Sequence, residues 1–394
     1  MTETQQPTTV GQLPTSRSDT SRVPAVLTRL IWLLWVGALG LAVAYLFRGH
    51  PWAAGPVVVD GLTAVMWVTA TFFSAIIHSY SRRYMAGSET IDRFFVRVFA
   101  FTLAVMTLVA ADHLLLFAAA WLAMGLVMAE LIGHVENWPQ AQAAGALARR
   151  HFLASTAALG AGLVALWADT GATTVSGLPD ALGTASPAVV VFAAGALVLA
   201  AMIQSALVPF HTWLLSSMTA PTPASALMHA GFVNAGGVLL IRFGPAVTVE
   251  AAVMLAIVLV GAASALLGKL LKTVQTDVKG QLACSTTGQM GFMIMQVGLG
   301  FFAAALTHLI LHGFYKAYQF LGSGSQVANE PPTTTGDARS TGVADVIGIA
   351  LTAVASGALF AALTGKGSKL DSGLLLAMLV ALTVLHAARE IVTR

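Results

Sequence analysis

Three protonatable side chains follow one another along an apolar run in the last third of the chain. The run reads His308-Leu-Ile-Leu-His312-Gly-Phe-Tyr-Lys316-Ala-Tyr-Gln319. Residues four apart share a helix face, so His308, His312 and Lys316 form a line, and Gln319 returns to nearly the same direction. Imidazole and amine groups at this spacing can pass a proton along. The pattern favours a proton relay; the alternative is that Lys316 snorkels to a membrane surface while the histidines hydrogen-bond neighbouring helices.

The composition places this relay in a membrane. Of the 394 residues, 57% are hydrophobic and 9% are charged, against about 25% charged in soluble domains. The mean hydropathy of +0.80 is typical of a chain made mostly of spanning helices. A lysine near a membrane centre costs at least ~2.5–3.5 kcal/mol and therefore needs a role or a partner.

Prolines interrupt apolar, helix-forming sequence between Gln204 and Pro245. Pro209, Pro221 and Pro223 each remove a backbone donor, so a continuous helix through residues 220–224 is not expected. Helices broken at membrane depth mark ion sites in transporters, because half-helix ends carry partial charges. Polar residues gather here: Gln204, Ser205, His211, Thr212, Ser216, Ser217, Thr219, Thr222, Ser225, His229 and Asn234. We expect His229 and Asn234 to share the helix after the break; the alternative is a proline-kinked helix with an ordinary loop.

For other polar residues inside the apolar runs, the sequence indicates a functional role less strongly. Ser285, Gln289 and Gln296 share one face of the run before the histidines and could form the other wall of a hydrated path. Glu130 and His134 lie four apart at the end of a run, where pairing at the membrane interface is the expected role. Asp60, at the start of a run, is also expected to pair at the interface.

Enzyme motifs do not occur in the sequence. It has no Walker loop, no GxSxG and no metal-spaced His/Cys set, and its one cysteine is Cys284. We therefore expect no catalytic residue, no metal and no cofactor in this chain. The net charge is +3, and the basic residues lie in short loops between apolar runs, so the charge does not indicate a nucleic-acid partner. Membrane lipid is an expected partner.

The apolar runs predict an all-α polytopic membrane protein with about twelve spans and one proline-broken helix. A span needs about 20 residues, and residues 211–220 add a half-helix. We expect a disordered tail at 1–23, a conducting domain at 24–325, a flexible loop at 326–342 and two C-terminal helices at 343–394. The expected spans are 26–47, 57–80, 94–111, 114–134, 150–169, 187–208, 224–242, 246–268, 281–298, 301–322, 343–364 and 370–388.

Lysine and arginine are distributed unevenly between the two ends of these spans. We call the membrane side that carries the N-terminus side A, and most of the 20 basic residues fall there. Arg48, Arg242, Lys366 and Lys369 fall on the opposite side, side B, and Lys316 lies within a span. Because basic loops stay in the cytoplasm, we expect side A to be cytoplasmic. The chain would then cross the cell (inner or plasma) membrane several times, with both termini in the cytoplasm.

Several segments resemble the proton-translocating membrane subunits shared by respiratory complex I and Mrp-type antiporters. They include Tyr80-Ser-Arg-Arg-Tyr-Met, Pro209-Phe-His-Thr-Trp, Ala220-Pro-Thr-Pro-Ala-Ser-Ala-Leu-Met-His229, Asp277-Val-Lys and the run from His308 to Lys316. Within that superfamily the sequence most resembles the DabB-type subunits of inorganic-carbon pumps. The segments that carry this closer likeness begin at Arg149, His229, Gln289 and Tyr315.

The resemblance covers about residues 57–327 and implies an antiporter-like fold that conducts cations, which in this family are expected to be protons. It further implies a large peripheral zinc partner of the DabA type, with a carbonic-anhydrase-like site that hydrates CO2. Proton flow through the membrane subunit would make that hydration effectively one-way. The residues expected on the proton path are Lys316, His312, His308, His229, Gln204 and Gln289, with Pro209, Pro221 and Pro223 at the broken helix.

Two departures from the complex I pattern keep other functions open. Complex I subunits carry a glutamate after the tryptophan that is Trp121 here, but this chain has Leu122. They also carry a lysine where this chain has Gln204 before Ser205. The alternatives are an Mrp-like or respiratory antiporter subunit, and a non-conducting membrane anchor for the partner.

Overall fold

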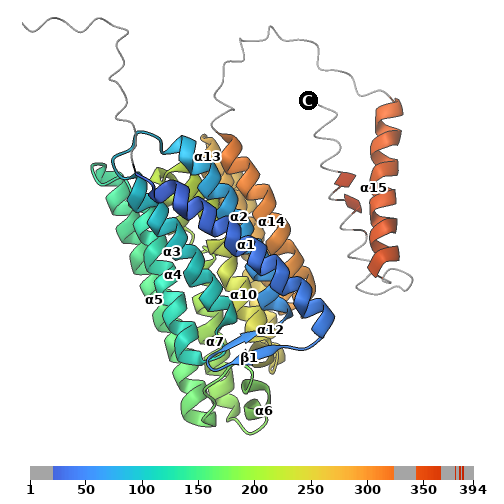
Figure 1. Ribbon diagram of the computed structural model, residues 1–394. Coiled ribbons are helices and arrows are strands. Elements are labelled where there is room, and N and C mark those ends of the chain that lie inside the picture. The colour runs from blue at the N-terminus through green and yellow to red at the C-terminus, as the bar shows by residue number, and fades with distance from the viewer. Residues whose placement is uncertain (1–20, 324–342, 365–377, 379–380, 383, 386–394) are drawn as a thin grey trace, which may run out of the picture. The chain divides into compact units, whose positions relative to one another are not determined.

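A computed structural model describes residues 21–323 and 343–364, together with residues 378, 381–382 and 384–385. In the described part of the chain, helices account for nearly all regular structure, with one short hairpin, so the all-α class is confirmed (Figure 1). The elements in order are α1 (Val23–Arg48), β1 (Trp52–Ala54), β2 (Val57–Val59), α2 (Gly61–Tyr84), α3 (Ile91–Ala110), α4 (Leu114–Ile132), α5 (Pro139–Thr170), α6 (Leu178–Leu182), α7 (Pro187–Gln204), α8 (Thr212–Ser216), η1 (Ser217–Thr219), α9 (Thr222–Ala230), η2 (Phe232–Asn234), α10 (Ala235–Arg242), α11 (Gly244–Val247), α12 (Ala251–Thr273), α13 (Val278–Gly298), α14 (Phe302–Gly322) and α15 (Val343–Thr364).

Eight segments of the described chain are long and apolar enough to cross a membrane: α1 to α5, α7, the pair α9–α10 and α12. Two further helices, α13 and α14, have 21 residues each, which is about 30 Å of helix. Their polar residues lower their hydropathy. Most of the run expected at 370–388 lies outside the described residues, so the count of twelve spans stays a prediction.

Some helix boundaries differ from the predicted runs for local reasons. The run expected at 57–80 begins as a strand, because Val57–Val59 pairs antiparallel with Trp52–Ala54. The helix starts only at Gly61, where the Asp60 side chain caps it by accepting a hydrogen bond from Thr63 N at 2.8 Å. Helix α5 starts at Pro139 rather than near 150, because proline suits a first helical turn and good helix formers follow it.

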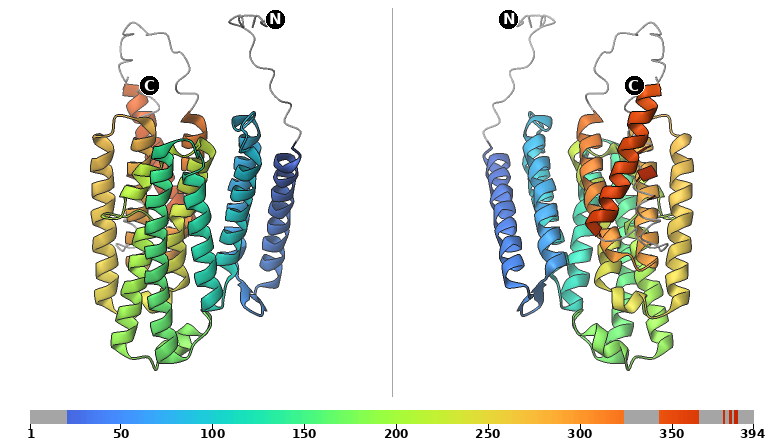
Figure 2. Two further views of the ribbon diagram at one scale, coloured as in Figure 1. Left: turned by 90° about the vertical axis from the view of Figure 1, so that its left-hand side faces the viewer. Right: turned by 90° about the vertical axis from the view of Figure 1, so that its right-hand side faces the viewer.

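The chain divides into two compact units, residues 1–327 and 328–394. In the first unit the long helices lie side by side, with α1 and α12 at opposite edges (Figure 2). Helix α12 packs against α13 at very short range, because glycines face each other there. A Cβ atom at Gly268 would lie 2.3 Å from Gly288 N, and one at Gly291 would lie 2.5 Å from Ala265 N. Only glycine allows backbones to approach this closely.

The interruption expected near Pro209 lies between α7 and α8, and it begins before the expected boundary at 208, because α7 ends at Gln204. Residues 205–211 are not helical; they contain Pro209, and Ala206 adopts a left-handed φ of 53°. The segment is held from both sides. Ser205 Oγ donates to the Val233 carbonyl at 2.6 Å, and Trp213 Nε1 donates to the Ile203 carbonyl at 2.9 Å. The first part of the non-helical segment, Ser205 to Leu207, is buried within protein, as a broken span requires, whereas Pro209 is exposed.

A second interruption separates α9 from α10. Residues 220 and 221 separate η1 from α9, so no continuous helix runs through residues 220–224, as expected; Pro221 and Pro223 lie at the start of α9. The helix then stops at Ala230, and residues 232–234 form the 3-10 turn η2. The expectation that His229 and Asn234 share one helix is wrong: Asn234 lies in η2, with its Nδ2 donating to the Ala230 carbonyl at 2.7 Å.

Candidate functional site

The line of protonatable residues on α14 faces the interior of the bundle. Lys316 is 0% exposed, His312 is 5% exposed and His308 is half-buried. The rings of His308 and His312 lie 6.1 Å apart. Lys316 Nζ donates to the backbone carbonyl of Leu282 on α13 at 3.0 Å. The snorkelling alternative does not describe this lysine, because its ammonium end is buried against a neighbouring helix.

The His308 end of the line contacts the polar face of α13. His308 Nδ1 lies 3.1 Å from Gln296 Oε1, and the Phe292 ring packs on the histidine ring at 5.4 Å. Because an amide oxygen accepts, Nδ1 of His308 is the nitrogen that carries the proton. Gln289, expected on the same face, is exposed and forms no side-chain hydrogen bond within the described residues. The structure therefore brings Gln296 to the site but not Gln289.

His229 joins this cluster from α9. Its Nδ1 lies 3.0 Å from Thr286 Oγ1, and that hydroxyl donates to the Leu282 carbonyl at 2.9 Å. Since the single hydroxyl proton of Thr286 is committed to Leu282, its oxygen accepts, which assigns the ring proton to Nδ1 of His229. The Leu282 carbonyl thus serves both Thr286 and Lys316, and it connects α9, α13 and α14.

Several buried polar atoms around this cluster have no protein partner among the described residues. They are His229 Nε2, His312 Nε2, Thr287 Oγ1 and Gln319 Oε1. A buried polar atom without a partner costs about 1–3 kcal/mol, and water or a ligand normally satisfies it. His229 Nε2, on a ring whose proton sits on Nδ1, has a free lone pair that can accept a proton. The arrangement can therefore bind and pass protons between three helices.

Gln204 lies at the interruption, at the C-terminal end of α7. It is fully buried, and both its amide oxygen and its amide nitrogen lack a partner within the described chain. Nearby, Trp121 Nε1 donates to Ser155 Oγ at 3.1 Å and Ser155 Oγ donates to the Ala200 carbonyl at 2.9 Å. This network is neutral, and Leu122 next to Trp121 adds no charge. Gln204 can bind a water molecule or a cation, but it cannot store a proton near neutral pH.

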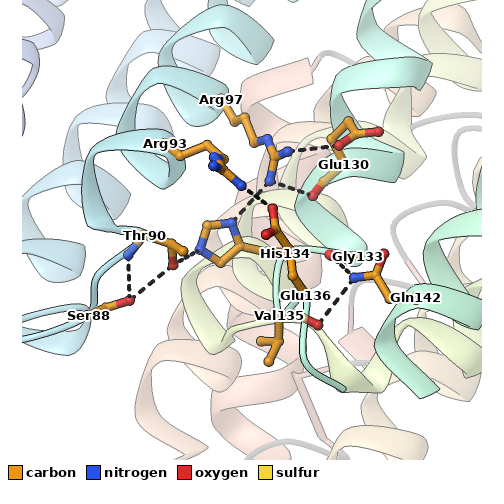
Figure 3. Close-up of polar contacts among 10 residues, drawn as sticks. All are labelled: Ser88, Thr90, Arg93, Arg97, Glu130, Gly133, His134, Val135, Glu136 and Gln142. Carbon is orange, nitrogen blue, oxygen red and sulfur yellow. Dashed lines mark hydrogen bonds and ion pairs between the residues drawn. The ribbon is translucent and has the colours of Figure 1, made fainter. Parts of the chain in front are cut away.

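A charged cluster lies toward side A, where α3, α4 and α5 meet (Figure 3). Glu130 pairs with Arg97 at 2.8 Å and with Arg149 at 2.6 Å. His134 Nε2 lies 2.9 Å from Thr90 Oγ1, and Arg97 Nη1 lies 3.3 Å from His134 Nδ1. The expected pairing of Glu130 with His134 is therefore wrong, because both residues turn to α3 instead. The cluster holds three helix ends together.

His134 makes the stability of this helix junction sensitive to pH. Its side chain lies outside the spans and is only 2% exposed. Burial, together with the charges of Arg97 and Arg93, lowers the pKa of His134 from 6.5 to about 4. Protonation is thus costlier in the folded state than in the unfolded state. The stabilising contribution of neutral His134 is full above pH 6.5 and is lost as the pH falls toward about 4.

We expect acidification from pH 7 to pH 5 to destabilise the wild-type protein more than the His134→Gln variant, by about 2 kcal/mol at most. Glutamine keeps a hydrogen-bonding group toward Thr90 but cannot be protonated. Thermal unfolding in detergent at the two pH values measures the difference, and His50→Gln at an exposed histidine serves as control. Equal pH responses of wild type and His134→Gln would contradict this assignment.

On side B, the expected pairing of Asp60 is found, and its position at a membrane interface stays a prediction. The Arg242 guanidinium at the end of α10 pairs with the Asp60 carboxylate and bonds the Val109 carbonyl, and it donates to Thr63 Oγ1 at 2.8 Å. Burial by itself raises the pKa of Asp60, but the Arg242 charge and the Thr63 hydrogen bonds bring it below its ordinary value of 3.8. This ion pair ties the end of the interrupted segment to α2 and α3.

A bundle of apolar helices with an interrupted span beside buried protonatable groups is the architecture of antiporter-like membrane subunits, and this defines the class of the protein. The chain belongs to the NADH:quinone oxidoreductase/Mrp antiporter transmembrane family, whose model matches residues 111–365. A model of the N-terminus of complex I chain 5 matches residues 56–95.

Known relatives confirm the resemblance to DabB-type subunits. The chain is 38% identical over 289 residues to "Probable inorganic carbon transporter subunit DabB1" of Halothiobacillus neapolitanus. The aligned region covers 69% of this chain and 50% of the relative. It is 34% identical over 369 residues to "Probable inorganic carbon transporter subunit DabB" of Bacillus subtilis. This alignment covers 90% of this chain and 71% of the relative. It is also 34% identical over 296 residues to "NADH-quinone oxidoreductase subunit L" of Mycobacterium tuberculosis (strain H37Rv). Here the alignment covers 74% of this chain and 45% of the relative.

The chain spans about half the length of two of these relatives. Among solved structures it is similar to the Mrp complex from Dietzia sp. DQ12-45-1b, with a TM-score of 0.69 and 25% identity over 93% of this chain and 45% of that one. It shares its fold with an archaeal membrane-bound sulfane sulfur reductase, with a TM-score of 0.71 and 17% identity over 77% of this chain and 66% of that one. Both of these structures are of membrane complexes.

Proposed function

We propose that this protein is the proton-conducting membrane subunit of an energy-coupled inorganic-carbon transporter. The observation that carries the proposal is the fully buried Lys316, aligned with His312 and His308 and linked to His229 through Leu282 and Thr286. Among the described residues Lys316 forms no ion pair. A membrane lysine of this kind is expensive to keep unless it moves charge.

The names of the relatives support inorganic carbon as the transported species. The proposed partner is a large peripheral zinc subunit of the DabA type, where CO2 is hydrated at a carbonic-anhydrase-like site. Zinc and catalysis belong to that partner. Proton flow through this chain makes the hydration one-way, so bicarbonate accumulates in the cell. The proposal places the chain in the cell membrane with both termini in the cytoplasm and with residues 24–325 as the conducting domain.

A specific observation favours a second function, a non-conducting membrane anchor for the partner. The region around Gln204 is neutral, and Leu122 adds no charge where complex I subunits are expected to carry one. A chain without that charged pair could have kept the assembly role and lost conduction. The row of His308, His312 and Lys316 on α14 distinguishes the two functions, because a non-conducting anchor does not need a buried lysine.

Co-expression in a carbonic-anhydrase-deficient bacterium tests the proposal. We expect growth in ordinary air when this chain and a DabA-type partner are both present, and no growth with either alone. A protonophore should abolish the accumulation of labelled inorganic carbon. Growth with the partner alone would contradict any role for this chain. Protonophore-resistant accumulation would favour the anchor, and sodium tolerance without carbon uptake would favour an Mrp-like antiporter.

A further inference from the structure

A surface groove lies between α1 and α2, toward side A and away from the α14 line. Its volume is about 600 Å³, and its wall includes Arg29, Trp32, Leu33 and Val36 of α1 together with Ser79 and Arg82 of α2. Trp32 Nε1 donates to Ser79 Oγ at 3.1 Å, which holds the two helices together at the groove. The groove thus lies between two helices that this hydrogen bond joins.

Two arginines from different helices form the rim of the groove. Arg29 and Arg82 are both exposed. Within the described residues, the ion pairs use Arg93, Arg97, Arg149 and Arg242, and neither rim arginine has a carboxylate partner. Neither forms a side-chain hydrogen bond there. Two unpaired guanidinium groups at one mouth attract a single anion, and guanidinium suits phosphate in particular.

Below this rim the wall is apolar. Arg29, Leu33 and Val36 follow at spacings of four and three, so they share one face of α1. Leu33 is 67% exposed and Val36 is 58% exposed, in a helix that is long and apolar enough to span the membrane. A tryptophan at this level is typical of the membrane–water interface. The groove therefore changes from cationic to hydrocarbon-like along its length.

We propose that this groove binds an anionic phospholipid, with its phosphate between Arg29 and Arg82 and an acyl chain along Leu33 and Val36. A phospholipid matches both parts of the wall at once. A free anion gains nothing from the apolar part, and an acidic peptide would place backbone polar groups against hydrocarbon. Basic pockets between spanning helices on the cytoplasmic side are known sites for such headgroups.

Native mass spectrometry of the full chain in detergent tests the proposal. We expect the wild-type protein to bind phosphatidylglycerol roughly tenfold more tightly than phosphatidylcholine, and the R29Q/R82Q variant to lose this preference. The matched control R83Q/R150Q removes the same charge from exposed arginines of side A that do not line the groove. It should keep the preference within about twofold. Circular dichroism and size-exclusion profiles of each variant establish that it is folded.

Three outcomes would overturn the proposal. If R83Q/R150Q loses the preference as fully as R29Q/R82Q, net charge rather than the groove selects the lipid. If soluble glycerol phosphate displaces the bound lipid at equal concentration, the site is one for free anions. If V36W, which fills the apolar wall, leaves phosphatidylglycerol binding unchanged, the acyl chain does not lie there, and an acidic partner segment becomes the better occupant.

Discussion

Replacing Lys316 with methionine is expected to abolish cation translocation while leaving the protein folded. Methionine keeps much of the length and apolar stem of lysine but cannot carry a proton. The Leu282 carbonyl that Lys316 bonds keeps its hydrogen bond from Thr286, so no buried acceptor is left without a partner. Because a buried charge is removed, stability should be unchanged or higher.

The expected loss is on the order of 100-fold in proton flux, the size typical of losing a positioned proton-transfer group. Reconstituted liposomes with a pH-sensitive dye measure this flux, and uptake of labelled inorganic carbon measures it in cells. Lys269→Met, at an exposed lysine of α12, is the matched control and should behave as wild type. Should Lys316→Met assemble normally and transport at the wild-type rate, the relay would be refuted and the anchor function would take its place.

Replacing Gly268 with alanine is expected to cause the largest loss of stability. The added methyl group would lie 2.3 Å from Gly288 N and 2.6 Å from Gly288 Cα. These are backbone atoms, so relief requires α12 and α13 to move apart. Overpacking of this kind costs ~3 kcal/mol. The thermal unfolding midpoint in detergent measures it.

The same substitution should also reduce translocation, because α13 carries the Leu282 carbonyl and the Thr286 hydroxyl that hold Lys316 and His229. Gly195→Ala is the matched control: it adds the same methyl group to helix α7, where nothing lies within 4 Å. That variant should be as stable as wild type or slightly more stable, since alanine favours helix over glycine by up to ~1 kcal/mol. Equal midpoints for Gly268→Ala and Gly195→Ala would show that the two helices do not depend on this contact.

Helical periodicity accounts for the parts of the site that the sequence predicted well. His308, His312 and Lys316 lie on one face because a spacing of four is a property of the α-helix itself. An interruption near Pro209 was also predictable, since proline cannot continue a helix, but the helix before it ends earlier than expected, at Gln204. These features depend only on residues close together in the chain.

Periodicity did not predict which long-range partners these residues meet. Lys316 and Leu282 are 34 positions apart, and His229 and Thr286 are 57 positions apart. A backbone carbonyl such as that of Leu282 leaves no signal in a sequence. Thr286 could be noticed only as one hydroxyl among many in α13.

Two errors show where local patterns compete with tertiary contacts. The spacing of Glu130 and His134 suggested a pair, but Arg97 on α3 and Thr90 just before α3 offered each a better partner. The apolar run from 224 to 242 suggested one helix, but the chain forms the turn η2 at residues 232–234, where Val233 accepts from Ser205. In both cases a partner from another helix decided the outcome.

The sequence by itself determined the membrane setting, the helical class, the interrupted span and the protonatable face of α14, because composition and short-range spacing dictate them. Only the tertiary structure decided that Lys316 is buried rather than snorkelling, that Gln296 and not Gln289 reaches His308, and that α12 and α13 meet through glycine backbones. The physical reason is that hydrophobicity and helical period are local properties. Burial and hydrogen-bond partners depend on which helices the whole chain brings together.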